Sequence, residues 1–454
     1  MPLAEGVSAR IAYKFYTDQK IIPGVPAVSA TDPGPTDAQV LRRVSSTLAF
    51  TKDTYQSNEI RSDYQISDFR HGVRRVAGNV SGELSPLTYA ELFAASLRSD
   101  WVAAVALSNT ELTSMTPNSG ASTLTFAGGD PVTSGLRTGM GVRFAGLAET
   151  ANNGTTYVIT GFSGTSNRVV AVTPAPTTSA AEATFTMSST GSTLFIPSTG
   201  HIRRKVAVEI YNEDVETARL FTECRVGGFN IQLPASGMAT CDWEFTGRDM
   251  EMYQDEAAPF FTDPNPVTTT HLLAAVNGQL RINGASKAVV TSMNIQHALA
   301  LSGEPVVGSN VVPEIFAGRS IVTGQMTAFF ENGDDLVQAF IDENEIDVIA
   351  YLTTASAPGS PAMSFHMPRV KLGGADIATT GEAGQMITVP FQALKYEGST
   401  AGVENTTIQI WDSEVTGPVG LGARSAGPES DEDRRRQESL SPAAEGERRS
   451  ASAG

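Results

Sequence analysis

Residues 58–97, NEIRSDYQISDFRHGVRRVAGNVSGELSPLTYAELFAASL, carry the pattern from which the fold of the chain can be inferred. The first part, up to His71, is rich in charges and predicts an exposed loop. Residues 72–84 alternate apolar and polar side chains, which predicts a strand with one buried face. Ser85 and Pro86 suit the N-cap and first position of a short helix, whose apolar stripe includes Phe93.

The same order of elements recurs in the second half of the chain. Gly318 and Gly324 bound a segment as Gly72 and Gly78 do, and each segment leads into an alternating strand and a short helix. Further correspondences join residues 68–69 to 314–316, residues 47–50 to 293–296, and the charged loop to residues 306–317. An ordered series is stronger evidence than one glycine spacing, so we predict a duplicated β-rich domain.

The composition favours a β-rich protein of several domains. A chain of 454 residues exceeds one compact core, and 7% aromatic and 18% charged residues with abundant glycine are typical of strands joined by turns. The net charge of −17 argues against a sequence-specific DNA-binding protein, which needs cationic side chains facing phosphates. We expect no signal peptide and no membrane partner, because no basic start or membrane-length apolar run is present.

Cysteine usage points to a reduced protein. Cys224 and Cys241 flank a predicted hairpin turn at residues 234–237 and are offset by several residues along its ladder. Their Cα atoms should therefore lie too far apart for a disulfide bond, which is consistent with synthesis in a cytoplasm.

Residues 106–199 differ from the rest of the chain, since charges become sparse and Thr, Ser, Gly and Ala dominate. Short strands are predicted here at residues 122–126, 141–144, 155–160, 168–173 and 184–187. Their spacing indicates an inserted small β-domain.

The other predicted elements lie on either side of this insert. Before and after it we predict strands at residues 8–16, 39–50 and 204–211, a helix or strand at 215–221, and a hairpin of 225–233 with 238–246. Beyond a polar boundary at 249–266 we predict strands at 278–282, 288–297, 321–330, 347–353, 363–370, 385–393 and 406–411, and a helix at 334–342. The resulting domains are residues 1–105 with 200–265, the insert 106–199, a second body 266–413, and a disordered, nearly neutral tail 414–454.

Several of these segments resemble the tail tube (major tail) proteins of long-tailed, siphovirus-like bacteriophages. The matching segments are Asn58-Glu-Ile-Arg-Ser-Asp63, Phe69-Arg-His-Gly72, residues 78–84 and 89–93, Val307-Gly-Ser309, Pro313-Glu-Ile315, Gly318-Arg319, and residues 322–324, 365–372 and 385–393. The resemblance covers most of residues 1–412 apart from the insert.

The resemblance implies a mainly β fold: a duplicated tail-tube β-sandwich or barrel domain, each copy with a short helix and a long loop. It also implies a structural virion protein, which self-assembles into stacked rings and forms the conduit for DNA ejection. The expected partners are further copies of the chain, the tail terminator, tape measure and distal tail proteins, and phage DNA passing through the lumen.

In that family the long loop helps to join one ring to the next, which by position corresponds to residues 51–71 here and 301–317 in the second copy. The residues expected to make this contact are Asn58, Glu59, Ile60, Arg61, Ser62, Asp63, Phe69 and Arg70 in the first loop. In the second loop they are Val307, Ser309, Glu314, Ile315 and Phe316.

The duplication leads to an inference about the ring. Two domains per chain would allow three chains to form a ring with pseudo-sixfold symmetry, with a hexamer as the alternative. The insert would then project outward, and the surplus negative charge would make the lumen repel DNA phosphates.

No enzyme signature, cofactor site or metal site is predicted. The five histidines lack metal-ligand spacing, residues 161–164 (GFSG) are one residue short of a nucleophile elbow, and residues 420–422 follow no strand. A calcium site in the acidic stretches 331–335 or 342–345 is an open alternative. Arg74, Arg75, Arg203, Arg204 and Lys205 are expected to pair with acids across subunit contacts. The alternative functions are a β-rich adhesin or receptor-binding virion protein and, less favoured, a hydrolase.

Overall fold

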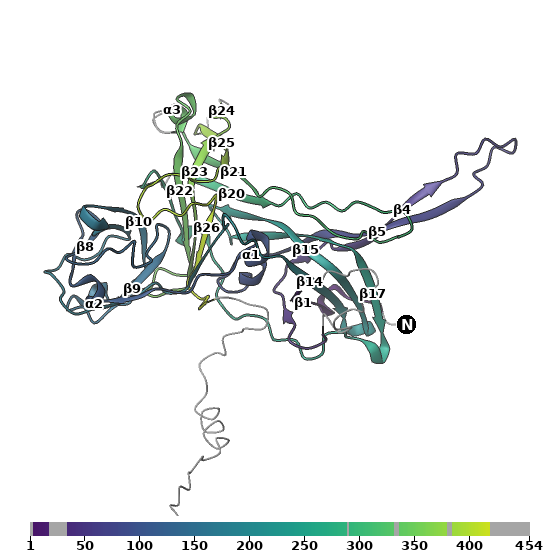
Figure 1. Cartoon of the computed structure of the whole chain (residues 1–454), viewed down its shortest axis with the longest axis horizontal. Helices are drawn as coiled ribbons and strands as arrows, with labels where there is room; N and C mark the ends of the chain where they lie inside the picture. The colour runs from purple at the N-terminus through teal and green to yellow at the C-terminus, as the bar shows by residue number, and fades with distance from the viewer. Residues whose placement is uncertain (1–2, 18–33, 288–289, 331–335, 379–383, 418–454) are drawn as a thin grey trace, which may run out of the picture.

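The computed structural model describes residues 3–17, 34–287, 290–330, 336–378 and 384–417, and these residues form a mainly antiparallel β protein. Two bodies lie side by side, a separate small sheet packs against one of them, and a narrow hairpin extends far from the other (Figure 1). The predictions for residues 331–335 and 420–422, and most of the predicted tail, fall outside the described residues.

The first copy of the duplicated unit is one sheet with a helix on it. Its main strands pair in the order β1-β14-β15-β16-β5-β4. Their bounds are β1 Ala9–Thr17, β4 Ala49–Gln56, β5 Phe69–Glu83, β14 Arg204–Asn212, β15 Thr217–Pro234 and β16 Thr240–Gly247; the helix α1 is Ala90–Leu97, and the shorter strands are β2 Gln39–Val40, β3 Ser45–Ser46, β13 Ser192–Phe195 and β17 Asp249–Gln254.

The second copy repeats this order of pairing as β18-β22-β23-β25-β21-β20. Its elements are β18 Gln279–Ile282, β19 Ala285–Ser286, β20 Val290–Ala298, β21 Ile321–Phe329, α3 Leu336–Ile341, β22 Ile346–Thr353, β23 Ala362–Leu372, β24 Asp376–Ala378, β25 Met386–Ala393 and β26 Gln409–Asp412. In both copies the helix follows the second strand of a hairpin.

The registers of the two copies agree residue by residue. Gly78 lies opposite Phe245, and Gly324 lies opposite Phe391. Both phenylalanines are buried. A Cβ on Gly324 would lie 2.3 Å from the ring of Phe391, whereas a Cβ on Gly78 would lie 2.5 Å from the carbonyl oxygen of Thr47. The β14–β15 and β22–β23 ladders even share a register shift at the same position, between Val206 and Val208 in one and between Ile346 and Val348 in the other.

The superposed registers reveal a match that the sequence patterns did not. Residues 225–232 (RVGGFNIQ) and residues 371–378 (KLGGADIA) occupy the same place, because Asn230 pairs with Asp242 as Asp376 pairs with Thr388. The predicted match of residues 47–50 to 293–296 is wrong by one residue. Phe50 lies opposite Val76 as His297 lies opposite Val322.

The insert forms its own seven-stranded sheet in the order β6-β12-β9-β10-β11-β8-β7. The strands are β6 Ala106–Ser108, β7 Met115–Asn118, β8 Thr123–Phe126, β9 Gly141–Ala145, β10 Tyr157–Ser163, β11 Val169–Thr173 and β12 Thr186–Ser188, with a short helix α2 Asn109–Leu112. Trp411 of β26 is buried in the insert core, and a Cβ on Gly141 would lie only 2.3 Å from its ring. The insert is therefore packed directly against the second copy.

The two copies share one hydrophobic core. Phe93 of α1 lies at its centre, with ring centroids 5.1 Å from Phe229, 4.8 Å from Trp243 and 6.2 Å from Phe365. Because Phe365 belongs to β23, this one side chain packs against both copies.

Several local predictions differ from the structure. The helix begins at Ala90 rather than after Ser85, whose hydroxyl contacts Thr88 Oγ1 at 2.6 Å instead of capping the helix. Leu87 adopts a φ of 68° between them, which is incompatible with a helix. Residues 39–50 form three short strands rather than one. The expected polar boundary at 249–266 begins with β17. Of the two alternatives for residues 215–221, the strand is confirmed, since most of them belong to β15.

The predictions for the cysteines and for the insert are confirmed. Both cysteines are free and buried on the predicted hairpin, where Cys241 lies opposite Ile231 rather than Cys224. All five strands expected in the insert are present within three residues of their predicted bounds. Among the described residues, no helix is long and apolar enough to cross a bilayer.

Replacement of Phe93 by alanine should destabilise both copies together. Removing a buried phenylalanine leaves a cavity and should lower the free energy of unfolding by about 3 to 5 kcal/mol. The same change at Phe329, which is 49% exposed, should lower it by less than about 1 kcal/mol. Urea titrations followed by the fluorescence of the three buried tryptophans would measure both. Equal losses would contradict the central role of Phe93.

Candidate functional site

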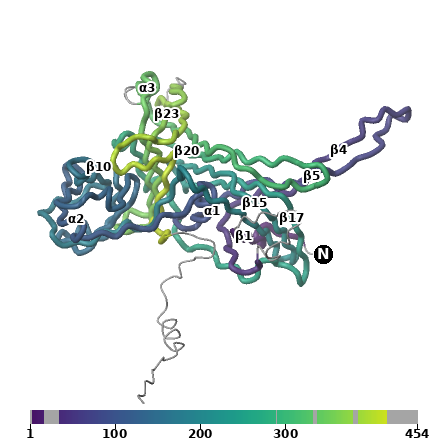
Figure 2. Tube along the Cα trace, in the orientation of Figure 1, coloured from purple at the N-terminus to yellow at the C-terminus, as the bar shows by residue number. Residues whose placement is uncertain are grey.

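A long hairpin is the most exposed part of the structure. The outer half of β4 and the start of β5 pair with each other and project beyond the body, with residues 57–68 between them (Figures 1 and 2). We call residues 52–74 the arm. The predicted loop at 51–71 is therefore largely a β-hairpin, and only its central part is outside strands.

The arm exposes apolar side chains that would ordinarily be buried. Those that lie exposed along it are Tyr55, Ile60, Tyr64, Ile66 and Phe69. A run of large apolar residues on a projecting hairpin indicates a surface that another molecule covers.

The charges of the arm pair with one another. Arg61 lies 2.9 Å from Asp63 and 3.8 Å from Glu59, and Arg70 lies 2.8 Å from Asp68. Hydrogen bonds from the neighbouring arginines lower the pKa of the Asp63 and Asp68 carboxyls, so both are charged at neutral pH. Exposed pairs of this kind contribute little to stability and can exchange partners.

All predicted contact residues of the first loop lie on this arm. The exposed residues Asn58, Glu59, Ile60, Arg61, Ser62 and Asp63 form its tip, and Phe69 and Arg70 begin β5.

The second copy carries an equivalent hairpin, but it does not project. Residues 299–320, which we call the docked loop, join β20 to β21, and Ser302 bridges to Phe316 as Tyr55 pairs with Arg70 in the arm. In Figures 1 and 2 this loop runs over the first copy toward β5, and the arm continues beyond the body in the same direction.

Specific contacts hold the docked loop on the first copy. The Arg74 backbone N–H donates to the Asn310 carbonyl at 2.8 Å, and Arg225 forms an ion pair with Glu314 at 2.7 Å. Arg248 Nε donates to the Val312 carbonyl at 2.5 Å.

Two apolar side chains of the docked loop are buried at this contact. Val312 and Ile315 are each 4% exposed. The loop and the first copy enclose a small cavity of about 80 Å³, lined in part by Ile315, Val226 and Leu301. The docked loop is therefore anchored by apolar burial and one charged pair.

The predicted contact residues of the second loop are divided by this docking. Glu314 and Ile315 face the first copy, whereas Val307, Ser309 and Phe316 remain exposed. Arg74, Arg225 and Arg248, which receive the loop, were not predicted as its partners.

The basic residues expected to pair across subunit contacts mostly pair within the chain. Arg74 pairs with Asp249, Arg75 with Asp53, Arg204 with Asp100 and Lys205 with Glu223. These four residues therefore have acidic partners within the chain, and their pairing across subunit contacts stays a prediction. Burial, together with the charges of Arg203 and Arg225, lowers the pKa of Arg98, so Glu314 docks beside a concentrated positive charge.

The two copies are joined through strand edges. Residues Gly228–Pro234 of β15 pair antiparallel with Ser292–Ala298 of β20. Eight strands therefore pair in sequence, β4-β5-β16-β15-β20-β21-β25-β24. Among the described residues, β4 and β24 each have one pairing partner, so the sheet ends in two unpaired edges.

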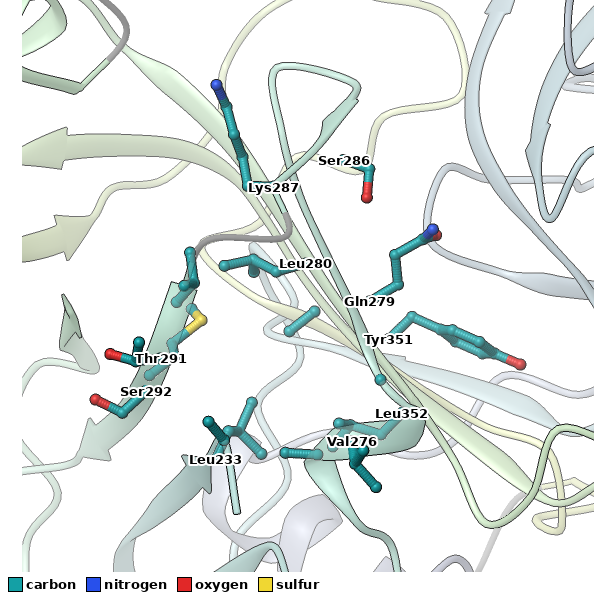
Figure 3. A pocket seen from close by; sticks show the side chains of 16 residues that line it. Leu233, Val276, Gln279, Leu280, Ser286, Lys287, Thr291, Ser292, Tyr351 and Leu352 are labelled. Atoms are coloured by element: carbon teal, nitrogen blue, oxygen red, sulfur yellow. The ribbon is translucent and has the colours of Figure 1, made fainter. Parts of the chain in front are cut away.

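An open cavity of about 380 Å³ lies between β20 and the β18–β22 pair (Figure 3). Its walls include Leu233, Val276, Leu280 and Met293, and Lys287 extends from its rim. No carboxylate, histidine or cysteine side chain is among the described residues that line it.

Two buried histidines have structural partners. His297 is buried between Ser96 and Ser320, with its ring nitrogens 2.8 and 2.7 Å from their hydroxyls, and burial lowers its pKa to about 4. His366 contacts Asp347 at 2.9 Å. No cluster of three potential metal ligands occurs in the described part of the chain, and Glu345 of the second acidic stretch pairs with Arg369. Gly161 lies within β10 rather than in a turn.

Asp412 connects the two copies. Its carboxylate accepts hydrogen bonds from the backbone N–H groups of Leu87 at 2.8 Å and Glu414 at 2.9 Å, and its backbone pairs with Ser192. Burial raises the pKa of Asp412 to about 7 despite these donors. Val415, just beyond the predicted start of the tail, is also buried.

The free energy of unfolding should therefore fall as the pH rises toward the folded-state pKa of Asp412. The folded-state pKa of about 7 exceeds the unfolded value of about 4, so the folded chain binds the proton more tightly. Its contribution is complete below about pH 4, and about 4 kcal/mol is lost by pH 7 and slightly above. Urea titrations of the wild type and Asp412→Asn across pH 4 to 8 should diverge by this amount. Parallel courses would contradict it.

The docked loop should detach when its apolar anchor is removed. In Ile315→Asn an unpaired amide would replace a buried side chain, so amide hydrogen exchange across residues 299–320 should accelerate about tenfold or more. Strands β14 to β16 should keep their protection. Val307→Asn is the matched control at an exposed position of the same loop and should change neither. Unchanged exchange in Ile315→Asn would show that the loop is held otherwise.

One comparison with known proteins finds a family that the chain matches. A family model described as phage tail tube protein matches residues 6–393, from just before β1 to the end of β25. No curated protein matches the chain.

Proposed function

The chain belongs to the phage tail tube protein family, which makes it a structural protein of the virion tail, and we propose that it assembles into stacked rings that form the conduit for DNA ejection. The observation that supports the ring is the contact between the two copies, which uses one edge of each and leaves an equivalent edge of each unpaired.

The internal contact also supplies a register for the contact between chains. Gly228 pairs with Ala298 and Gln232 with Asn294 inside the chain. By the equivalence of the copies, residues 374–378 of one chain would pair antiparallel with residues 47–51 of the next. Such a heterologous contact, repeated head to tail, closes into a ring and removes both free edges.

The duplication favours three chains per ring. If the contact between chains copies the contact within them, each chain supplies two of six similar positions, and a trimer has pseudo-sixfold symmetry. A hexamer of chains is the alternative. The insert would project outward from the ring, and the acidic chain would line a lumen that repels DNA phosphates.

Ring-to-ring contacts are assigned to the two hairpin tips. The tip of the arm, residues 58–63, is exposed. The tip of the docked loop, residues 304–309, is also exposed, although the rest of that loop is docked on the first copy. Tips that stay free after lateral contacts form can reach an adjacent ring. The tail terminator, tape measure and distal tail proteins would meet the tube ends and lumen, after synthesis in the host cytoplasm.

Electron microscopy and native mass spectrometry of the purified protein test this assembly. We expect rings of three 47.9 kDa chains and stacked tubes. Deletion of residues 58–63 should leave rings that no longer stack, because the deletion removes only the exposed tip. Six chains per ring would contradict the trimer, and discrete unstacked particles of the wild type would favour the adhesin instead.

A further inference from the structure

The docked loop shows how the arm would be held. The two hairpins share a register, since Ser302 bridges to Phe316 as Tyr55 pairs with Arg70. Counting from the shared glycines, Gly72 and Gly318, places Ile66 at the position of Val312, Asp68 at that of Glu314 and Phe69 at that of Ile315. These three pairs share their chemistry: apolar, acidic, apolar.

The burial of these positions differs sharply between the two hairpins. Val312 and Ile315 are 4% exposed, whereas Ile66 and Phe69 are 66% and 47% exposed. The docked loop covers its apolar residues with the first copy of its own chain. Nothing within the described chain covers the apolar residues of the arm. A surface equivalent to the one that binds the docked loop would have to come from another molecule.

The surface that would receive the arm exists on the second copy. Arg225, which holds Glu314, corresponds to Lys371 through the aligned segments RVGG and KLGG. Lys371 is exposed, and like Arg225 it carries a positive charge at the equivalent position. Ser320 corresponds to Arg74, whose backbone N–H donates a hydrogen bond to the Asn310 carbonyl of the docked loop. The charge and the backbone donor that hold one hairpin are therefore both present for the other.

The direction of the two hairpins agrees with this assignment. The docked loop points from the second copy onto the first, and the arm points onward from the first copy, away from the body (Figure 1). In a ring in which copies alternate, the next body in that direction is the second copy of the neighbouring chain.

We propose that the arm is a lateral clasp within the ring, in which Ile66 and Phe69 bury against the second copy of the adjacent chain and Asp68 pairs with its Lys371. This inference rests on the proposed ring, and it assigns to residues 64–70 a contact within the ring rather than between rings. The tip at 58–63 stays free for the axial contact.

Asp68 has a partner on its own arm, which the clasp must accommodate. Its Oδ2 atom accepts from Arg70 Nε at 2.8 Å, and its Oδ1 atom accepts from the Phe69 backbone. A carboxylate has lone pairs for further donors, so Lys371 can join without displacing Arg70. The pairing would then be shared among three charges at the rim of an apolar contact.

A charge exchange tests the pair directly. Asp68→Lys alone would face Lys371 with a like charge, and Lys371→Asp alone would face Asp68, so each should reduce the fraction of protein in rings about tenfold or more. Combining both changes should restore rings, since the attraction returns with reversed polarity. Single variants that form rings as the wild type does, or a double variant that stays unassembled, would overturn the clasp.

The apolar part has its own matched pair of variants. Phe69→Asn should reduce ring formation about tenfold or more, because it removes a large side chain that assembly buries. Ile60→Asn, at a tip position fully exposed in the arm, should leave rings intact. Circular dichroism of each unassembled variant should match the wild type, since these residues contribute nothing to the core.

The outcomes separate this inference from the proposed function. Wild-type protein that forms no rings would reject the function itself. Wild-type rings together with Asp68→Lys or Phe69→Asn variants that form single, unstacked rings would reject only the clasp, because the contact would then lie between rings. Loss of rings in these variants, with rescue by the charge exchange, supports it.

Discussion

The pairing of β15 with β20 is the contact on which the rest of the structure depends. It joins four strands of each copy into one run of eight paired strands, and it brings Phe365 to the same core that Phe93 fills from the other copy. A sheet edge presents unpaired N–H and C=O groups that favour pairing with another strand. The fold satisfies one edge from each copy internally. The other two lie at opposite ends of the eight paired strands, where no described strand pairs with them.

The two copies have kept their backbone registers while changing the side chains that decorate them. Lys205 and Glu223 form an ion pair beside the β14–β15 register shift, and Glu345 and Arg369 form one at the corresponding place with the charges reversed. Either polarity gives the same attraction, so the pair could change sign without disturbing the ladder. The glycines opposite Phe245 and Phe391 had no such freedom, since a Cβ on Gly324 would lie 2.3 Å from the ring of Phe391.

The parts of the fold that were predictable are those governed by local pattern. Alternation located β5 and β21, and the hairpin turn located β15 and β16. The helix start was not predictable, because Leu87 is held at a positive φ by a hydrogen bond to Asp412, far along the chain. The docking of residues 299–320 was hidden for the same reason: Arg225 and Glu314 meet only after both copies have folded. The match between RVGG and KLGG was present in the sequence, but two glycines and similar neighbours carry weight only once the registers are known.

The two hairpins differ in a way that separates folding from assembly. The docked loop binds a surface of its own chain, so its contact forms without the loss of translational freedom that association between molecules requires. It can therefore form as the chain folds, and its ion pair involves Arg225, which is largely buried. The arm would bind an equivalent surface on another chain and must overcome that loss, with the exposed Lys371 in place of a buried arginine. A weaker version of one contact would keep the chain soluble until enough copies are present, and the gain from closing a ring would then hold every arm in place at once. Duplication would thus use the same hairpin and strand edge twice. One copy of the contact stabilises the subunit, and the other would form a reversible contact between subunits.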